Sequence, residues 1–198
     1  ETLDDAIGEA FDKSARLLGL GYPGGPAIAA KAAKFKIESA KLKIKLPRPM
    51  ENSKDYNFSY SGLKTAVLYL VRDLKNEGID VTSEPVINTI AHEFQEAATD
   101  VLIQKTGRAI KEFGVKSLLL SGGVSANTVL RHKLKNIAAE TGIKYFCPAM
   151  EYTTDNAAMI AVAGYFTYRK NKIPHITTYV WGKTASSEAV EMDANLTL

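Results

Sequence analysis

The sequence predicts an α/β protein in which parallel strands alternate with helices. In its second half, a short apolar run at 116–120 is followed by a glycine-rich turn and a helical segment to about Thr141. A second apolar run at 144–147 and an alanine-rich helix to about Tyr168 follow. This alternation is typical of a layered fold with parallel strand pairing. The first half shows helical periodicity instead, and its apolar stripe over 85–113 predicts one long helix.

Further helical segments are expected in the first half, separated by glycine, proline and polar turns. Apolar spacing predicts a helix over about 4–18, which two glycines end. A tight turn at 22–26 separates it from a second helical segment over 27–40. Prolines and polar residues predict a loop over 46–54, and the next helix runs from Ser61, its expected N-cap, to about Asn76.

The composition is that of an ordinary globular protein with little charge bias. The chain has 198 residues and a formal net charge of +3, which permits contact with nucleic acid without arguing for it. Lysines gather over 31–45 beside apolar residues, and a solvated face is favoured there over a phosphate-contacting face. A single cysteine, Cys147, excludes an intramolecular disulfide, fits a reducing cytoplasm and is expected to be a buried, inert thiol. No stretch is long and apolar enough to predict a membrane span.

Two glycine pairs are candidate points of contact with a ligand. Gly122 and Gly123 follow the strand expected at 116–120, where the missing Cβ atoms let the backbone approach a phosphate or ribose. A glycine turn between a strand and a helix is also common architecture, so both interpretations stay open. Gly24 and Gly25 offer a second approach point, although a turn that ends a helix is favoured there.

Three polar residues are candidates for ligand or metal contact, each with a structural alternative. Asn127 can exchange hydrogen bonds with a ribose or purine, or it can cap the helix that follows. Asp155 is expected in the first turn of the alanine-rich helix, where a carboxylate can bind a metal or the free N–H groups of the helix start. Asp12 is expected on a solvated acidic face of the first helix.

Other catalytic arrangements find little support in the residues. The three histidines, His92, His132 and His175, lack the paired spacing of a metal site. No Ser-His-Asp arrangement is legible. The residues alone therefore indicate an α/β nucleotide-binding module of undefined activity.

Six phrases occur in a fixed order along the chain: ETLDDAIGEAFDK at 1–13, YPGGP at 22–26, FSYSGLKT at 58–65, FQEA at 94–97, SGGVSAN at 121–127 and TDNAAMIA at 154–161. Together they closely resemble the TsaD family of tRNA threonylcarbamoyladenosine transferases. The resemblance extends to about Trp181, and six motifs in order make chance agreement implausible.

The resemblance implies the actin-like ATPase fold of sugar kinases and Hsp70-type chaperones, here as a C-terminal lobe with inserted helices. It also implies a reaction, the transfer of a threonylcarbamoyl group from threonylcarbamoyl-AMP to the exocyclic amine of the adenosine beside the tRNA anticodon. The expected partners are tRNA, a TsaB-like paralogue and a TsaE-like ATPase, and a homodimer is a further expectation. The expected location is the cytoplasm, or the mitochondrion for an organellar relative.

Site residues are implied where this sequence matches the family's motifs. Asp12, Gly25 and Asn127 would contact ATP or threonylcarbamoyl-AMP. The Gly122–Gly123 pair would line the same pocket. Asp155 would be one ligand of a divalent metal, iron or zinc, which can hold phosphate and carbonyl oxygens of the adenylate. The family's other metal ligands are two histidines, one helical turn apart, in an N-terminal half that this sequence does not contain.

The chain is therefore expected to be the C-terminal part of a TsaD-type protein, inactive as a transferase alone because a metal site needs its complete ligand set. Three segments are expected: helices with a nucleotide-contacting turn over 1–115, an α/β segment over 116–183, and a tail over 184–198. Strand character is expected at 176–181. The alternatives are an ATP-binding noncatalytic partner subunit and a sugar-kinase-like ATPase.

Overall fold

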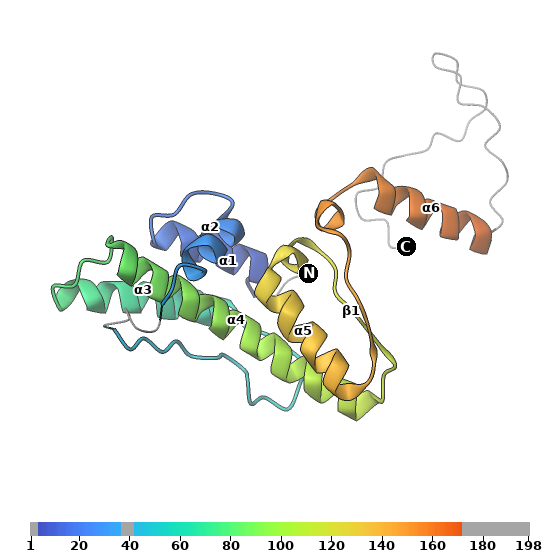
Figure 1. Cartoon of the computed structure of the whole chain (residues 1–198), viewed down its shortest axis with the longest axis horizontal. Helices are drawn as coiled ribbons and strands as arrows, with labels where there is room; N and C mark the ends of the chain where they lie inside the picture. Colours follow the sequence, from blue (N-terminus) through green and yellow to red (C-terminus); the bar gives the residue numbers. More distant parts are fainter. Residues whose placement is uncertain (1–3, 37–41, 172–198) are drawn as a thin grey trace, which may run out of the picture. The chain divides into compact units, whose positions relative to one another are not determined.

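The computed structural model describes residues 4–36 and 42–171 (Figure 1). The packing divides the chain into two compact units, residues 1–153 and 154–198. The segments expected over 1–115, 116–183 and 184–198 stay a prediction, and the strand expected at 176–181 lies outside the described residues.

Four helices build the first part of the larger unit. They are α1 (Ile7–Leu17), α2 (Gly24–Ala32), α3 (Ser61–Asn76) and α4 (Glu84–Phe113). The long helix α4 is the central element, because α2 and α3 both pack on it while α1 packs on α2 and α3 (Figure 1). Their apolar faces form one core, whose largest fully buried side chains include Ile28, Leu63, Val67, Ile90 and Phe94.

Most helices lie where the apolar periodicity predicted them. The structure confirms the helices expected over 61–76 and 85–113 to within one residue. The helix expected over 27–40 exists, but its bounds were wrong, because α2 begins at Gly24 and ends at Ala32; residues 37–40 lie outside the described ranges. The carboxylate of Asp12 accepts a hydrogen bond from the Gly24 N–H and so satisfies the first donor of α2. The glycine pair therefore begins a helix, and its interpretation as a turn that ends one was wrong.

A small parallel sheet completes the larger unit. Its strands β1 (Ser117–Leu119) and β2 (Lys144–Phe146) pair in parallel, with their first residues opposite each other. The turn after β1 forms the short 3-10 helix η2 (Gly123–Ala126), and α5 (Thr128–Thr141) then packs on α4 and β2. A second 3-10 helix, η3 (Met150–Tyr152), follows β2. The predicted strand–helix–strand order and its parallel pairing are confirmed.

The smaller unit contains α6 (Ala157–Asn171), the alanine-rich helix that the sequence predicted. Asn156 caps its start, since the Asn156 Oδ1 accepts a hydrogen bond from the Met159 N–H at 3.0 Å. Asp155 thus precedes the cap instead of lying in the first turn, where it was expected. Within 4–36 and 42–171, no helix combines the length and the apolar character that crossing a bilayer requires.

Candidate nucleotide site

The turn after β1 has an exposed backbone that only glycine adopts easily. Gly122 has φ +82°, in the region that side chains disfavour, and its carbonyl accepts a hydrogen bond from the Ser125 N–H at 2.9 Å. Gly122 and Gly123 are both exposed. A Cβ added at Gly123 would meet no atom within 4 Å, so packing among the described residues does not require a glycine there. The turn therefore leaves open space beside its backbone.

Asn127 caps α5, which was one of its two predicted roles. Its Oδ1 accepts a hydrogen bond from the Leu130 N–H at 3.0 Å, and its Nδ2 donates to the Gln95 Oε1 at 3.0 Å. These bonds use one of the two amide hydrogens and one oxygen lone pair. The other hydrogen and lone pair remain available, so helix capping does not exclude the predicted contact with a nucleotide.

Asp12 joins α1 to the start of α2 instead of lying on the solvated face that was expected. Its Oδ1 accepts the Gly24 N–H at 2.7 Å. Gly24 is packed against α1 so closely that a Cβ there would lie 2.5 Å from the Asp12 Cα. At Gly25, by contrast, an added Cβ would meet nothing within 4 Å. The junction between α1 and α2 thus combines a carboxylate held in place, that of Asp12, with an open backbone position at Gly25.

Helix α1, which carries Asp12, also contacts the turn that contains Gly122 and Gly123. An added Cβ at Gly8 would lie 3.6 Å from the Val124 Cγ2, a normal van der Waals distance. Asp12 lies four residues after Gly8, on the same face of α1. Phe11, the residue before Asp12, packs edge-to-face on Phe94 of α4, with ring centroids 5.0 Å apart. The structure thus places the Asp12 and Gly122 regions on neighbouring elements.

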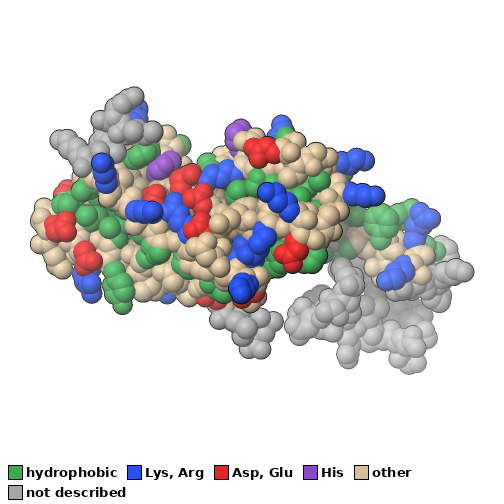
Figure 2. All heavy atoms as spheres, turned by 90° about the horizontal axis from the view of Figure 1, so that it is seen from below, with side chains coloured by type: hydrophobic (Ala, Val, Ile, Leu, Met, Phe, Trp, Pro, Cys, Tyr) green, Lys and Arg blue, Asp and Glu red, His purple; other side chains and the backbone are tan. Residues whose placement is uncertain are grey.

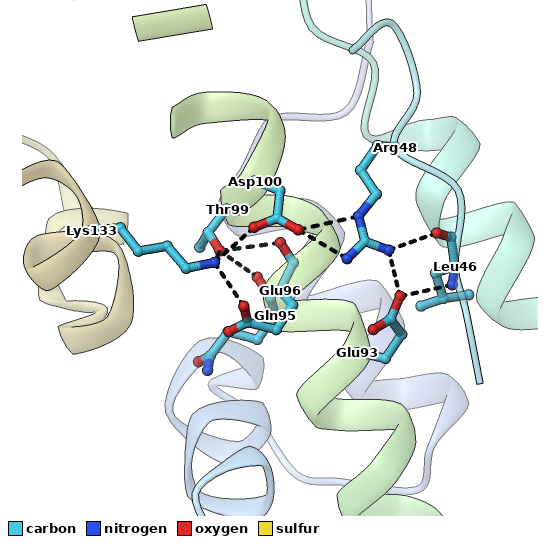
Figure 3. Close-up of polar contacts among 8 residues, drawn as sticks. All are labelled: Leu46, Arg48, Glu93, Gln95, Glu96, Thr99, Asp100 and Lys133. Carbon is cyan, nitrogen blue, oxygen red and sulfur yellow. Dashed lines mark hydrogen bonds and ion pairs between the residues drawn. The ribbon is translucent and has the colours of Figure 1, made fainter. Parts of the chain in front are cut away.

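A polar network on α4, which the sequence did not predict, holds α5 and the segment before α3 (Figure 3). Lys133 of α5 reaches Glu96 and Asp100 at 2.8 Å each and Thr99 at 3.0 Å. Asp100 also accepts a hydrogen bond from Arg48 at 2.9 Å. Arg48 in turn pairs with Glu93 and donates to the Leu46 carbonyl at 2.8 Å.

The charges of this network stabilise one another. Burial disfavours the ionised form of Asp100, but hydrogen bonds from Lys133 and Arg48 outweigh that effect and lower its pKa. Burial likewise opposes the charge of Lys133, yet its hydrogen bonds to Asp100 and Glu96 raise its pKa. Asp100 and Lys133 are therefore both ionised at neutral pH, and their ion pair fixes α5 on α4.

Asp4 performs the cap that was expected of Ser61. The Asp4 carboxylate accepts hydrogen bonds from the Ser61 N–H at 2.8 Å and from the hydroxyls of Ser59 and Ser61 at 2.7 and 2.9 Å. Ser61 is already the first helical residue of α3, so its interpretation as the N-cap was wrong. Burial would raise the Asp4 pKa, but the hydrogen bonds lower it to about 2.

Asp155 belongs to the smaller unit. Within the described residues of that unit, 154–171, its carboxylate forms no hydrogen bond or ion pair, while the neighbouring Asn156 caps α6. Within 4–36 and 42–171, no three His, Cys, Asp or Glu side chains converge on a point that would hold a metal. As a single carboxylate, Asp155 can supply one side-chain ligand.

His92, His132 and Cys147 make other contacts or none with the candidate site residues. His92 stacks on Phe35 with ring centroids 4.2 Å apart, and His132 lies 3.4 Å from the Asn136 amide. His175 lies outside the described residues. Cys147 is partly buried, less than the expected fully buried thiol.

The surface carries mixed charge around the helices. Figure 2 shows Lys and Arg side chains interspersed with acidic ones on the face that it presents. In the lysine-rich stretch, Lys31 forms an ion pair with Glu84 at 2.7 Å, and Lys34 lies 3.8 Å from the same carboxylate. These pairs favour the predicted solvated face over a phosphate-contacting one.

A shallow depression elsewhere on α4 is lined by Glu51, Asn52, Gln104, Lys105 and Arg108. Its two cations already bind the preceding loop, since Lys105 donates to the Ser53 hydroxyl at 2.8 Å and Arg108 to the Ser53 carbonyl at 2.7 Å. None of the predicted site residues lines this depression. Lys105 and Arg108 thus hold the loop before α3 on α4.

Comparisons with known proteins agree on one family. A family model described as TsaD, tRNA N6-adenosine threonylcarbamoyltransferase, matches residues 1–162. A protein of that name from Thermosipho africanus is 48% identical over 170 residues, which are 86% of this chain and 48% of the relative. Its counterpart from Thermosipho melanesiensis is 50% identical, and that from Herminiimonas arsenicoxydans is 52% identical; each match covers 83% of this chain and under half of the relative. The chain thus spans about half the length of the curated relatives it matches.

Proposed function

Because the chain belongs to the TsaD family of tRNA N6-adenosine threonylcarbamoyltransferases, we propose that it is part of a tRNA-modifying transferase. The reaction moves the threonylcarbamoyl group from threonylcarbamoyl-AMP to the exocyclic amine of the adenosine beside the anticodon. We infer the actin-like ATPase fold for the whole protein, of which this chain is the C-terminal lobe with inserted helices.

The open glycine positions beside fixed polar groups are the observation that carries this proposal. Packing among the described residues does not require glycine at Gly25 or Gly123, since a Cβ at either would meet none of their atoms within 4 Å. A nucleotide placed there would explain both, because its phosphates and ribose could approach the backbone closely. Asp12 and Asn127 lie beside these two positions and are themselves held by the Gly24 N–H and by Gln95.

The residues of this chain would serve to bind and orient the adenylate. In the transfer, the amine of adenosine attacks the carbamoyl carbon and forms the new C–N bond, the bond from that carbon to the phosphate oxygen breaks, AMP leaves with the electron pair, and the amine releases one proton to solvent. Backbone N–H groups of the Gly122–Gly123 turn would hold the phosphate and so stabilise that charge. Asn127 would use its free amide hydrogen and lone pair to orient the adenylate.

The metal is a separate part of the proposal. The family resemblance implies iron or zinc, which would polarise the adenylate oxygens when bound. Asp155 would be one ligand, and the two histidine ligands would come from outside this chain. We therefore expect residues 1–198 alone to bind the metal weakly and to lack transfer activity.

The proposed partners follow from the same family. They are tRNA as substrate, a TsaB-like paralogue, a TsaE-like ATPase and a second copy of the protein, in the cytoplasm. A noncatalytic ATP-binding subunit is the alternative function, and the presence of both Asn127 and Asp155 argues against it.

Isothermal titration with ATP and with a nonhydrolysable threonylcarbamoyl-AMP analogue tests the proposal. The wild-type chain should bind, and Gly25→Ala should weaken binding at least about tenfold, because the new methyl occupies space that the ligand needs. Full-strength binding by Gly25→Ala would overturn the site. Transfer activity is then measured on a chimera that supplies the unmatched half of the Thermosipho africanus relative. A chimera that binds the analogue but modifies no tRNA would favour the noncatalytic alternative.

A further inference from the structure

We propose that Gln95 is a positioning residue of the nucleotide site, acting through Asn127. The proposal rests on the proposed function, because it assigns to Gln95 the orientation of a residue expected to contact the adenylate. Gln95 lies on α4 in the FQEA phrase, which resembles the family but received no role from the sequence.

The hydrogen bonds fix the Asn127 side chain in one orientation. A backbone N–H can only donate, so the atom of Asn127 facing the Leu130 N–H at 3.0 Å must be its oxygen. The Asn127 nitrogen then faces Gln95, whose acceptor oxygen lies 3.0 Å away. Without that acceptor, the Asn127 amide would keep its helix cap but lose the contact that sets its plane.

The burial of Gln95 indicates that its amide is needed for a polar contact. Gln95 is 4% exposed, and its neighbours Phe94 and Ala98 on α4 are fully buried apolar residues. A buried amide without a partner destabilises a protein, and an apolar side chain would pack in this place at lower cost. The hydrogen bond to Asn127 is the contact that compensates the burial.

Three successive residues of α4 join the two parts of the candidate site. Phe94 packs on Phe11, the residue before Asp12, with ring centroids 5.0 Å apart. Gln95 holds Asn127, and Glu96 holds Lys133 of α5 at 2.8 Å. A change at Gln95 therefore alters the Asn127 amide while α1 and α5 keep their other anchors on α4.

The test compares three variants of this chain by titration with the threonylcarbamoyl-AMP analogue. Gln95→Leu removes the acceptor, and the dissociation constant should rise about tenfold. Gln95→Glu keeps an acceptor oxygen in place and should restore most of the affinity. Lys133→Met is the matched control, because it weakens the same α4–α5 interface without touching Asn127, and its affinity should stay within about twofold of the wild type.

Nuclear magnetic resonance of the Asn127 side-chain amide reports the same contact without any ligand. The amide hydrogen that Asn127 donates to Gln95 should exchange slowly with water in the wild type and in Gln95→Glu, and rapidly in Gln95→Leu. Equal loss of affinity in Gln95→Leu and Lys133→Met, or unchanged exchange in Gln95→Leu, would overturn the positioning role. A wild-type chain that binds no analogue while Gln95→Leu still accelerates exchange would instead refute the proposed nucleotide site and leave the Gln95–Asn127 contact established.

Discussion

Replacement of Gly24 by alanine should disrupt the junction between α1 and α2. The added methyl would lie 2.5 Å from the Asp12 Cα, 2.7 Å from the Phe11 carbonyl oxygen and 2.9 Å from the Ala15 Cβ. Two of these three atoms belong to the backbone, so no side-chain rotation can relieve the overlap. The helices must move apart instead.

The size of the effect follows from these distances. Carbon atoms in contact normally lie about 3.5–4.0 Å apart, so α1 and α2 would have to separate by about 1 Å here. Overpacking of this kind costs about 1–3 kcal/mol. The separation would also break the 2.7 Å hydrogen bond from the Gly24 N–H to Asp12, which adds about 1.5–3 kcal/mol because the acceptor is charged. We expect a total loss of about 4 kcal/mol in the free energy of unfolding.

Urea denaturation followed by circular dichroism measures this loss, with Gly25→Ala as the matched control. Gly25 is the next residue of the same helix, but an added Cβ there meets no atom within 4 Å. Its substitution should change the free energy of unfolding by less than about 0.5 kcal/mol. A loss below about 1 kcal/mol for Gly24→Ala, or equal losses for the two variants, would refute the close packing that underlies the reasoning.

Three further perturbations probe other parts of the larger unit. Asp4→Asn should lower the free energy of unfolding at pH 7 by about 1–2 kcal/mol, as measured in urea, because it weakens the cap of α3 and the cap is partly screened by solvent. The folded pKa of Asp4 is about 2, below its ordinary 3.8, so the wild type alone should lose the stability that the cap contributes as the pH falls from about 4 to 2. Parallel profiles of stability against pH for the two proteins would contradict this role of Asp4. Lys133→Met should lower the free energy of unfolding by about 1–3 kcal/mol, because Glu96 and Asp100 lose their shared cation. The difference in stability between wild type and variant should be smaller in 1 M salt than at low salt. Gly8→Ala should raise the free energy of unfolding by about 0.5 kcal/mol, and the thermal midpoint with it, because alanine restricts the unfolded chain and its Cβ would touch a neighbour only at normal distance. A drop in the midpoint would show that α1 and the glycine turn pack more closely.

Patterns among neighbouring residues predicted the helices and one of the caps. Helices α3 and α4 were predicted to within one residue because their apolar stripes repeat over many turns. The sequence also gave capping as one of two roles for Asn127, since an asparagine after a glycine turn and before a helix carries that signal. The start of α2 was not predicted, because the acceptor for the Gly24 N–H is Asp12, on the preceding helix.

Contacts between distant residues were beyond the reach of sequence patterns. Asp4 and Ser61 are 57 positions apart, and Lys133 is 33 positions from Asp100. Each residue alone resembles a solvated charge. The FQEA phrase at 94–97 resembles the family, but it does not indicate which residues its side chains contact. Such pairs become visible only when packing brings their helices together.

The sequence by itself determined the family, the parallel α/β order after residue 116 and the identity of the candidate residues, because motifs and periodicity are properties of neighbouring residues. The tertiary structure decided what those residues touch. It showed that Asp12 accepts the first N–H of α2, that Gln95 holds Asn127 and that Gly25 and Gly123 face open space among the described residues. The physical reason is that a hydrogen bond or an open space depends on distances across the fold, which the packing of α2, α3 and α5 on α4 and of α1 on α2 and α3 sets.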